Sequence, residues 1–450
     1  MNNKNKIDII GGGPAGLSVG YYAKKIGMNV TIYESTSLIG GNCKTIIDGE
    51  FRYDTGAHRL HDKDSMVTNE IKSLLGDSLL KVSSPSKIYF EGRSFNFPIN
   101  IKDIIFKFDL KTLSKILTEN IRTRLRKTRS PQHFKDVAYS SYGKTISDMF
   151  LIPYTEKLWG QKAHRLDVSI TGGRLKSLDL KSIIIDMFKR KNNNSGHYEG
   201  DFYYPVSGFG EIFEAMGSSI GVNNIHLNSK ISYIEHKDKN ITSIIDSNGS
   251  CLPIKNLVYT ASLDHLFKSL NPKPPQKILD HLDNIKYRSI FICAIYLDMK
   301  NFSSNASIYF PDSGCPFTRI YEPKNRSKKM SPENKTCLVI EVPVGENGLD
   351  DSLSKKIIYE KILNYLIDKK LLDPKKIINY RLVKINNAYP VISTDSIIHT
   401  EKMKEYLSTI KNLHLVGRNS DFEYIHTHDI MRRSRLLVNK MVSSQPKLKL

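Results

Sequence analysis

Three glycines and one acidic residue near the N-terminus have the spacing of a dinucleotide-binding turn. Gly11, Gly13 and Gly16 lie between two apolar runs, and Glu34 ends the second run. The first glycine permits a tight turn, the second lets the backbone approach a pyrophosphate, and the third allows close helix–strand packing. A glutamate at this distance can accept hydrogen bonds from a ribose hydroxyl. The pattern therefore predicts a strand, a turn, a helix and a second strand, with phosphates at the helix N-terminus.

A second glycine pair, Gly40-Gly41, follows this unit and precedes Asn42. The pair is consistent with a backbone that passes close to a large extended ligand again, and a plain surface turn is the alternative. Here the chain resembles flavoproteins of the amine oxidase and UDP-galactopyranose mutase superfamily, which carry the same pair after the acidic residue. The resemblance implies FAD as the cofactor. Its expected contacts in this region are Gly11, Gly13, Gly16, Glu34, Gly41 and Asn42.

Three later segments bring the resemblance closer to the UDP-galactopyranose mutases. They are Gly56-Ala57-His58, Tyr154-Thr155-Glu156-Lys157-Leu158-Trp159-Gly160 and Pro316-Phe317-Thr318-Arg319-Ile320. By resemblance, His58 lies beside the flavin ring, Tyr154 stacks on the uracil of a nucleotide sugar, and Trp159 borders the sugar. Aromatic side chains suit both partners because each offers a flat apolar surface.

Arginines supply the expected phosphate contacts. By resemblance, Arg319 binds the substrate pyrophosphate and shields flavin charge, and Arg174 makes a second phosphate contact. A guanidinium suits this task because it binds two phosphate oxygens at once and stays charged. His58, Arg319 and Arg174 are therefore the expected catalytic residues, and Tyr154, Trp159 and Arg319 are the expected substrate-binding residues.

The C-terminal part adds Gly417, Arg418 and Tyr424, which by resemblance close over the flavin ring and the pyrophosphate. The chain then departs from the bacterial mutases, because His426 and His428 stand where those proteins have a tyrosine–aspartate pair. The contacts around the flavin pyrimidine and the sugar must therefore differ. Two histidines two positions apart do not share a helix face, so we expect flavin contacts or a helix cap here and no metal site.

The elements that position these residues indicate an α/β fold. The resemblance implies a Rossmann-like FAD-binding domain of the GR2 type, a helical insertion and an antiparallel-sheet substrate domain. The expected ranges are 1–66, 200–262 and 408–450 for the FAD-binding domain, 101–199 for the insertion, and 67–100 and 263–407 for the substrate domain. At the end of the insertion, Lys189–Gly200 is polar and rich in Asn and Gly, which is typical of a linker.

Composition limits the class of protein. The 450 residues include 40% hydrophobic and 25% charged residues, which predicts a globular chain and excludes a coiled coil or wholesale disorder. The five cysteines are scattered, which argues against a disulfide framework and against a structural zinc site. No apolar run approaches the roughly 20 residues of a membrane span, and the N-terminus lacks a signal-peptide core. We therefore expect a cytoplasmic protein.

Charge indicates the kind of partner. Lys and Arg number 67 against 46 Asp and Glu, and the net charge of +21 favours anionic ligands. The basic stretch from Arg122 to Arg129 is either a solvated helix face or a peripheral contact with an anionic membrane surface. Nucleic acid is not expected, because the chain has neither interleaved aromatic residues nor a known binding module. The sequence does not predict an oligomeric state.

Three functions are compatible with the resemblance. The first is a nucleotide-sugar mutase of cell-surface polysaccharide biosynthesis, which converts a pyranose to a furanose through an adduct at N5 of reduced FAD. The second is an FAD-dependent oxidoreductase of the amine oxidase or protoporphyrinogen oxidase type, and the third is a flavin-binding subunit without chemistry of its own. The segments that contain Trp159 and Arg319 favour the mutase.

Overall fold

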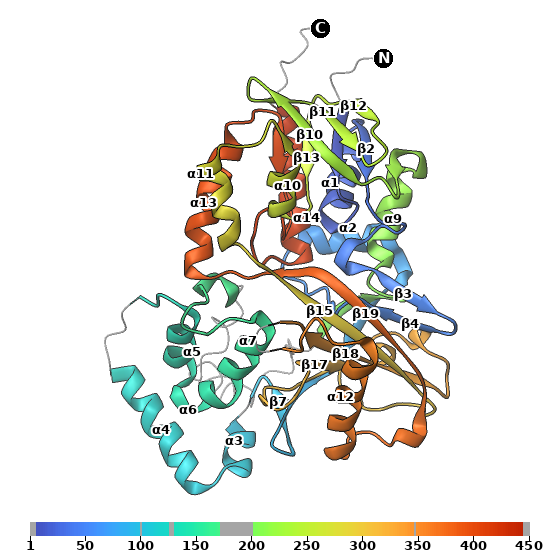
Figure 1. Ribbon diagram of the computed structural model, residues 1–450. Helices are drawn as coiled ribbons and strands as arrows, with labels where there is room; N and C mark the ends of the chain where they lie inside the picture. The colour runs from blue at the N-terminus through green and yellow to red at the C-terminus, as the bar shows by residue number, and fades with distance from the viewer. Residues whose placement is uncertain (1–5, 100, 126–129, 172–200, 346–347, 444–450) are drawn as a thin grey trace.

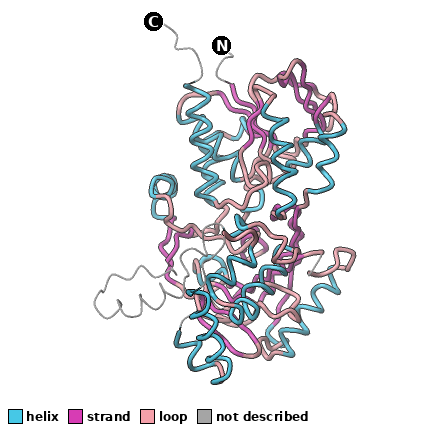
Figure 2. Tube along the Cα trace, turned by 90° about the vertical axis from the view of Figure 1, so that its left-hand side faces the viewer, coloured by secondary structure: helices cyan, strands magenta, loops and turns pink. Residues whose placement is uncertain are grey.

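The structure of the chain is a computed structural model that describes residues 6–99, 101–125, 130–171, 201–345 and 348–443. The predicted linker Lys189–Gly200, Arg174 and residues 126–129 of the basic stretch lie outside the described residues. Figure 1 shows an upper lobe around a parallel sheet and a lower lobe around a larger sheet, with a group of helices at the lower left. Figure 2, a view turned by 90°, shows the same two lobes.

A five-stranded parallel sheet forms the centre of the upper lobe. Its order is β20 (Leu413–Leu415), β13 (Leu257–Tyr259), β1 (Lys6–Ile10), β2 (Asn29–Tyr33) and β9 (Ile225–His226). Successive side chains of β13 enter opposite layers, because Val258 packs in one hydrophobic core and Leu257 and Tyr259 pack in another. The sheet is therefore covered on both faces, as parallel sheets usually are. This confirms the predicted Rossmann-like unit.

Helices cover one face of the parallel sheet. They are α1 (Pro14–Lys25), α2 (Ser65–Leu75), α9 (Glu211–Ile220) and α14 (Thr427–Ser443). α1 begins directly after Gly13 with Pro14 at its first position, where the missing N–H costs nothing. Lys24 and Lys25 occupy its last turn, where cations interact favourably with the helix dipole.

A four-stranded sheet and further helices cover the other face. The strands are β12 (Cys251–Pro253), β11 (Asn240–Asp246), β10 (Ile231–Lys237) and β14 (Leu270–Asn271). The helices are α10 (Leu263–Ser269), α11 (Gln276–Leu279) and α13 (Thr394–Ser408). α13 begins with a capping box in which Ser393 and Ser396 each accept a hydrogen bond from the other's backbone N–H.

The lower lobe contains a seven-stranded sheet. Its order is β19 (Ile377–Pro390), β15 (Tyr287–Leu297), β18 (Thr336–Pro343), β17 (Arg319–Tyr321), β16 (Ser307–Tyr309), β6 (Ser86–Phe90) and β7 (Arg93–Phe97). All neighbours are antiparallel except β16 and β6. α12 (Lys355–Asp368) packs on one face, and Phe51 and Tyr53 pack on the other. The predicted antiparallel sheet is thus confirmed, with one parallel pair inside it.

The helical insertion packs at the β6–β7 end of this sheet. It comprises α3 (Ile101–Lys107), α4 (Leu110–Leu125), α5 (Phe134–Tyr142), α6 (Lys144–Ile146), a π-helical turn (Ser147–Leu151) and α7 (Ile152–Trp159). Its core contains Ile104, Ile116 and Phe150, together with Ile88 and Phe95 of the sheet. The insertion therefore shares its core with β6 and β7.

The predicted domain ranges stay predictions, but two pairings bear on their boundaries. α2 packs against α9 and α14, and β5 (Leu79–Ser83) pairs with β8 (Asp201–Pro205). Residues 65–83 thus share the core of the upper lobe. A hairpin of β3 (Thr45–Asp48) and β4 (Phe51–Asp54) adjoins both lobes. Among the described helices, none combines the length and apolar character needed to span a lipid bilayer.

Candidate active site

A large cavity lies where the two lobes and the helical insertion meet. Its volume is about 1760 Å³, and its lining runs from the glycine turn after β1 to the strands of the seven-stranded sheet and to α5 and α7. Pockets for a single small ligand usually measure about 300–1,000 Å³. The cavity therefore has room for an extended dinucleotide and for a second ligand beside it.

The surroundings of the three glycines in the turn differ, and so does the effect of adding a side chain at each. Gly11 has φ +104°, and a Cβ there would lie 2.4 Å from Oγ1 of Thr260; a Cβ at Gly16 would lie 1.9 Å from the carbonyl oxygen of Gly11. At these two positions the protein's own atoms leave no room for a side chain. A Cβ at Gly13 would have Cα of Gly41 as its nearest neighbour, at 3.6 Å. Gly13 lines the cavity, so a side chain there would enter space that is open to a ligand.

The N-terminus of α1 is open to an anion. No side chain caps this helix, and its first turn contains no acidic residue. The carboxylate of Glu34 is buried beside it, where Oε2 accepts a hydrogen bond from the backbone N–H of Gly12 (2.7 Å) and Oε1 accepts one from that of Thr36 (2.9 Å). A carboxylate oxygen accepts more than one hydrogen bond, so Glu34 is fixed in place and can still receive a hydroxyl.

Three side chains form a row across adjacent strands at the other end of the cavity. Arg319 on β17 lies directly opposite Tyr309 on β16 and opposite Glu341 on β18. Directly opposite residues share a face of the sheet. Arg319 donates from Nε to Oε2 of Glu341 (2.9 Å) and from Nη2 to Oε1 (2.7 Å), and its Cζ lies 5.8 Å from the ring centroid of Tyr309.

The geometry of this ion pair leaves part of the guanidinium for a ligand. Glu341 is 2% exposed and also accepts a hydrogen bond from the backbone N–H of Ala57 (2.8 Å). Arg319 lines the cavity with 17% of its side chain exposed, and no described residue accepts a hydrogen bond from its Nη1. Two N–H donors of a fixed, charged group therefore remain available to an anion.

Tyr154 approaches the same row from α7. Its ring centroid lies 5.7 Å from that of Tyr309 in a T-shaped contact. Burial raises the pKa of the Tyr154 hydroxyl, an effect that the nearby Arg319 opposes. The hydroxyl is therefore protonated at neutral pH. Tyr154, Tyr309 and Arg319 thus present two aromatic rings and one cation to the same wall of the cavity.

α7 is tied to the loop that precedes β17. The buried Lys157 donates from Nζ to the carbonyl oxygens of Asp312 (2.7 Å) and Cys315 (3.1 Å), and its own carbonyl accepts a hydrogen bond from Nη2 of Arg288 (3.0 Å). Burial lowers the pKa of Lys157 to about 8. These bonds connect the segment that contains Tyr154 to the segment that contains Arg319.

His58 lines the cavity between the two ends. Its ring stacks on Phe209 with centroids 5.1 Å apart, and its carbonyl accepts a hydrogen bond from Nη1 of the buried Arg326 (3.1 Å). Burial, assisted by the charges of Arg418, Arg326 and Arg319, lowers the pKa of His58 to about 3. The imidazole is therefore neutral at pH 7, and its Nδ1 has no hydrogen-bond partner among the described residues.

An aromatic corner encloses the cavity near the start of α14. Trp159 is 4% exposed and makes a T-shaped contact with Tyr424, with centroids 5.0 Å apart. The guanidinium of Arg418 lies 5.4 Å from the Tyr424 ring and 5.7 Å from the Tyr389 ring, and it donates two hydrogen bonds to the carbonyl oxygen of Ile425. Arg418 is thus held against two rings.

The two histidines after Tyr424 lie at the N-terminus of α14. The backbone N–H of His426 donates to Oδ2 of Asp429 (3.2 Å), and Nε2 of His428 lies 3.3 Å from the same oxygen. Asp429 therefore caps this helix. The ring centroids of His426 and His428 are 5.8 Å apart. In the part of the chain that the structure describes, no group of three or more His, Cys, Asp or Glu side chains is arranged to hold a metal ion.

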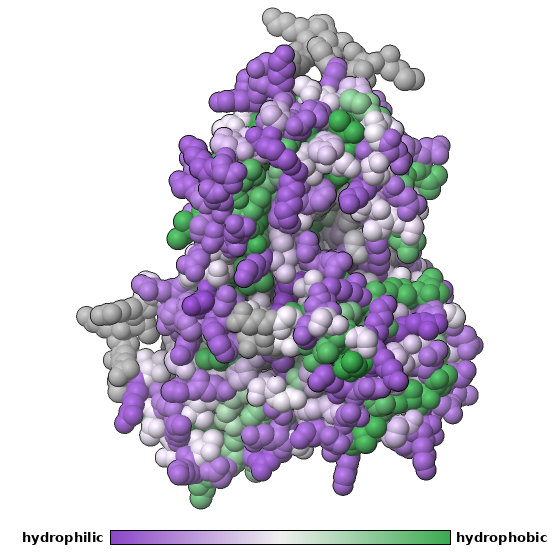
Figure 3. Space-filling view, viewed as in Figure 1, coloured by the Kyte–Doolittle hydropathy of each residue, from purple (hydrophilic) through white to green (hydrophobic). Residues whose placement is uncertain are grey.

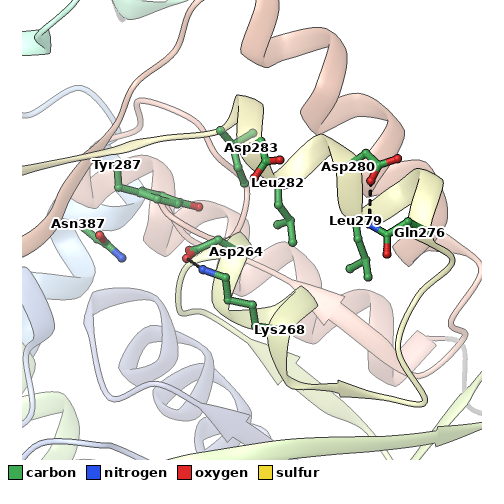
Figure 4. A pocket seen from close by; sticks show the side chains of 10 residues that line it. Asp264, Lys268, Gln276, Leu279, Asp280, Leu282, Asp283, Tyr287 and Asn387 are labelled. Atoms are coloured by element: carbon green, nitrogen blue, oxygen red, sulfur yellow. Dashed lines mark hydrogen bonds and ion pairs between the residues drawn. The ribbon is translucent and has the colours of Figure 1, made fainter.

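A smaller pocket of about 400 Å³ lies beside the large cavity (Figure 4). Two of its polar contacts join its own lining residues, since Lys268 pairs with Asp264 (3.3 Å) and Gln276 donates to Asp280 (2.8 Å). Asn387 lines both spaces. The side chains predicted to bind cofactor or substrate line the larger cavity instead.

The predicted site residues that the structure describes come together, with one exception. Those that line the large cavity are Gly11, Gly13, Glu34, Gly41, Asn42, His58, Tyr154, Trp159, Arg319, Gly417, Arg418 and Tyr424. Gly16 does not line it and acts through packing. Arg174 lies outside the described residues, and the division of the others between cofactor and substrate stays a prediction.

Sequence reasoning missed four residues that shape the site, which are Tyr309, Arg326, Glu341 and Tyr389. Only Glu341 had a visible signal, because it is the one charged residue in the apolar strand Thr336–Pro343. A charge in such a strand needs a buried partner. The others depend on strand register and on cation–π contacts, which the local sequence does not reveal.

FAD fits the glycine end of the cavity. Gly13 leaves space for a ligand, the uncapped N-terminus of α1 suits a pyrophosphate, and Glu34 suits a ribose hydroxyl. Gly41 has φ +52°, and a Cβ there would lie 2.9 Å from Cα of Gly13, so the two glycine segments approach each other closely. His58 and Arg418 lie farther along the same cavity, where the flavin ring of an extended FAD would reach.

Comparisons with known proteins agree with this geometry. UDP-galactopyranose mutase of Mycoplasma genitalium is 21% identical over 450 residues, which cover 94% of this chain and 92% of that protein. Mitochondrial protoporphyrinogen oxidase of Nicotiana tabacum is 23% identical over 255 residues, or 51% of this chain, and the match spans half (50%) of the plant enzyme's length. A crystal structure of reduced UDP-galactopyranose mutase has the same fold, with a TM-score of 0.85, 20% identity, and coverage of 98% of this chain and 96% of that one.

The family is shown by a match along most of the chain. The model of the flavin containing amine oxidoreductases matches residues 14–427, which include most of both lobes, the insertion and most of the residues that line the large cavity. The glycine turn, the parallel sheet and the cavity that joins them to the seven-stranded sheet suit a flavin cofactor. The chain belongs to the flavin containing amine oxidoreductase family.

Proposed function

We propose that the protein is an FAD-dependent mutase that acts on a nucleotide sugar with its flavin reduced. The observation that carries the proposal is the convergence of Tyr154 and Arg319 on Tyr309, within the cavity that also contains the glycine turn. A nucleoside diphosphate needs a flat apolar surface for its base and a fixed cation for its phosphates. The cavity offers both beside the place for the cofactor.

Each residue has a role that follows from its contacts. Arg319 binds the diphosphate through Nη1, and Glu341 fixes its orientation through Nε and Nη2. Tyr154 supplies the surface for the base. His58 stays neutral near pH 7, so it exchanges hydrogen bonds in the cavity without adding charge. When bound and reduced, FAD supplies an electron-rich ring nitrogen that can react with the sugar.

Similarity supports the mutase over other flavin chemistry. The relative from Mycoplasma genitalium and the reduced mutase structure both match nearly the whole chain. The two segments that resemble mutases, around Trp159 and Arg319, meet at the cavity and are joined through Lys157. An enzyme of this kind would serve the synthesis of cell-surface polysaccharide.

Binding of UDP to the chemically reduced protein tests the proposal. We expect UDP to bind the reduced holoprotein. Arg319→Lys should weaken binding at least about tenfold, because lysine keeps the charge but loses the planar N–H donors that bind two phosphate oxygens at once. Arg381→Lys is the matched control, since Arg381 pairs with Asp48 on an exposed part of β19. A reduced protein that binds no nucleoside diphosphate would overturn the proposal.

A second candidate is an oxidoreductase that acts on an apolar substrate. The side of the cavity formed by the insertion is apolar, and its lining includes Phe134, Ile146, Phe150, Leu151 and Leu158. The similarity to a protoporphyrinogen oxidase points in the same direction. Loss of flavin absorbance on anaerobic addition of a substrate, without any reductant, would favour this function over the mutase.

A further inference from the structure

Five large apolar side chains are exposed on α3 and α4. They are Ile105 (53% exposed), Phe106 (82%), Leu110 (85%), Leu117 (63%) and Ile121 (57%), and we call them the α3–α4 ridge. The two helices form the lower left end of the molecule in Figure 1, and Figure 3 shows apolar surface at the lower end of this region, bordered by hydrophilic residues. Exposed apolar side chains that gather in this way mark an interaction site.

The ridge is separate from the face of α4 that packs in the core. Leu110, Leu117 and Ile121 are spaced by seven and four residues, which places them on one side of the helix. Ile116 is 4% exposed and packs in the core of the insertion. α4 therefore carries two apolar faces, and within the described part of the insertion only one of them packs in a core.

Basic residues flank the ridge on α4. Lys111, Lys115 and Arg122 are exposed, and their side chains form no ion pair with any residue that the structure describes. The nearby acidic groups are bound within the insertion. Asp109 accepts a hydrogen bond from the backbone N–H of Thr112 (2.9 Å), and Glu119 accepts one from that of Thr145 (2.7 Å). Three exposed basic side chains thus stand beside the ridge against the one exposed carboxylate of Asp109, and the net exposed charge on this part of α4 is positive.

We propose that the α3–α4 ridge docks on a membrane surface that contains anionic phospholipid. An apolar stripe beside basic residues is the arrangement of helices that lie in the membrane interface, because the apolar side chains enter the acyl region while long basic side chains reach the headgroups. A second copy of the chain fits this surface less well. A symmetric contact would bring the same basic residues together, between two chains that each carry +21.

Docking would hold the wall of the large cavity close to the lipid. α4 packs on α6, and Ile146 and Phe150 of the same core line the cavity. This inference does not depend on the proposed mutase activity, because it rests on the outer face of the insertion alone.

Vesicle sedimentation of the purified holoprotein tests the proposal. We expect binding to vesicles of phosphatidylcholine mixed with phosphatidylglycerol, and weaker binding to phosphatidylcholine alone. The double variant Phe106→Ser with Leu110→Ser should bind at least about tenfold more weakly. Replacement of Lys111, Lys115 and Arg122 by Gln should weaken binding about hundredfold, at about fivefold for each basic side chain.

A matched control separates the ridge from exposed apolar surface in general. Val222 (78% exposed) and Ile398 (61%) lie in the upper lobe, so the variant Val222→Ser with Ile398→Ser should bind vesicles within about twofold of the parent protein. Flavin content and thermal unfolding show that each variant is folded. Equal binding by the ridge variant and the parent, or a ridge variant that instead dissociates a dimer in sedimentation velocity without any vesicle binding by the parent, would overturn the proposal.

Discussion

The glycine turn and the Tyr309–Arg319–Glu341 row are built from different parts of the chain. The turn is made by backbone atoms of one continuous segment, in which Gly11 and Gly16 pack and Gly13 leaves space. The row is made by side chains from three strands, which come together only through sheet register. Both ends face one cavity.

The two halves of the site are therefore sensitive to different kinds of substitution. The turn depends on the absence of side chains, because an added Cβ collides with the protein at Gly11 and Gly16 and enters the cavity at Gly13. The row depends on a buried pair of charges, so the loss of one partner leaves the other without compensation in a medium of low polarity. Substitutions can therefore separate steric effects at one end from electrostatic effects at the other.

Alanine at the glycines should give the largest effects. Gly16→Ala puts a Cβ 1.9 Å from the carbonyl of Gly11, which forces α1 away from β1. We expect destabilisation by about 3 kcal/mol or more and loss of bound flavin. Gly13→Ala places its Cβ where the protein has room, so the apoprotein should unfold at nearly the parent temperature while flavin affinity falls at least about tenfold.

Calorimetry of the apoproteins and flavin titration distinguish these two outcomes. Gly13 has φ −82°, an ordinary value for alanine, so backbone strain does not confuse the result. Parent-like flavin affinity in Gly13→Ala would mean that no ligand approaches this glycine. Parent-like stability in Gly16→Ala would mean that the turn and the helix adjust more freely than close packing allows.

Removal of Arg319 should have the next largest effect. Arg319→Met leaves the carboxylate of Glu341 buried with only the N–H of Ala57 as a partner, and we expect a loss of about 3–5 kcal/mol in the free energy of unfolding. The double variant Arg319→Met with Glu341→Gln removes both charges and keeps an acceptor for Ala57. It should recover most of the stability while UDP binding stays lost.

Urea unfolding of the single and double variants measures this coupling. Lys384→Met is the control, because Lys384 pairs with Asp351 at the surface and should cost no more than about 1 kcal/mol. If the double variant were no more stable than Arg319→Met, the loss would come from packing rather than from the unpaired charge.

The same contrast explains how much the sequence could predict. The glycine turn, Glu34 and the parallel strands follow from local patterns, because apolar runs and glycine spacing decide them within about 30 residues. The structure also brings Tyr154, Trp159 and Arg319 to one cavity, as the resemblance implied. These residues lie in continuous segments that are distinctive by themselves.

What the sequence could not give is the register between distant strands. Glu341 meets Arg319 only because β17 and β18 pair at that position, and Arg326 reaches the His58 carbonyl from a turn 268 residues away. The exposed ridge was missed for another reason. The basic stretch Arg122–Arg129 is visible in the sequence as a run of charges, whereas Phe106 and Leu110 lie earlier in the insertion and look like ordinary core residues. Their exposure depends on how α3 and α4 pack.

The smallest effect concerns His58, which lies between the two ends and is sensitive to both. Its pKa is lowered to about 3 in the folded protein, whereas an unfolded histidine titrates near 6.5. The unfolded state therefore binds more protons below about pH 6.5, so the neutral form stabilises the fold above that pH and the contribution is lost as the pH falls. Between about pH 7 and about pH 5, the parent should lose about 2 kcal/mol that His58→Asn does not lose.

Thermal unfolding across this pH range measures the difference, with His164→Asn as the control at an exposed position. Two of the three arginines that oppose protonation of His58 lie at different ends of the site. Arg319 belongs to the row, and Arg418 follows Gly417, where a Cβ would lie 3.2 Å from Cβ of Ala15 at the start of α1. Arg319→Met should therefore raise the pKa of His58 and reduce its part of the pH dependence. A pH dependence equal in the parent and in His58→Asn would show that the imidazole is not held neutral. His58 would then not link the electrostatics of the two ends of the cavity.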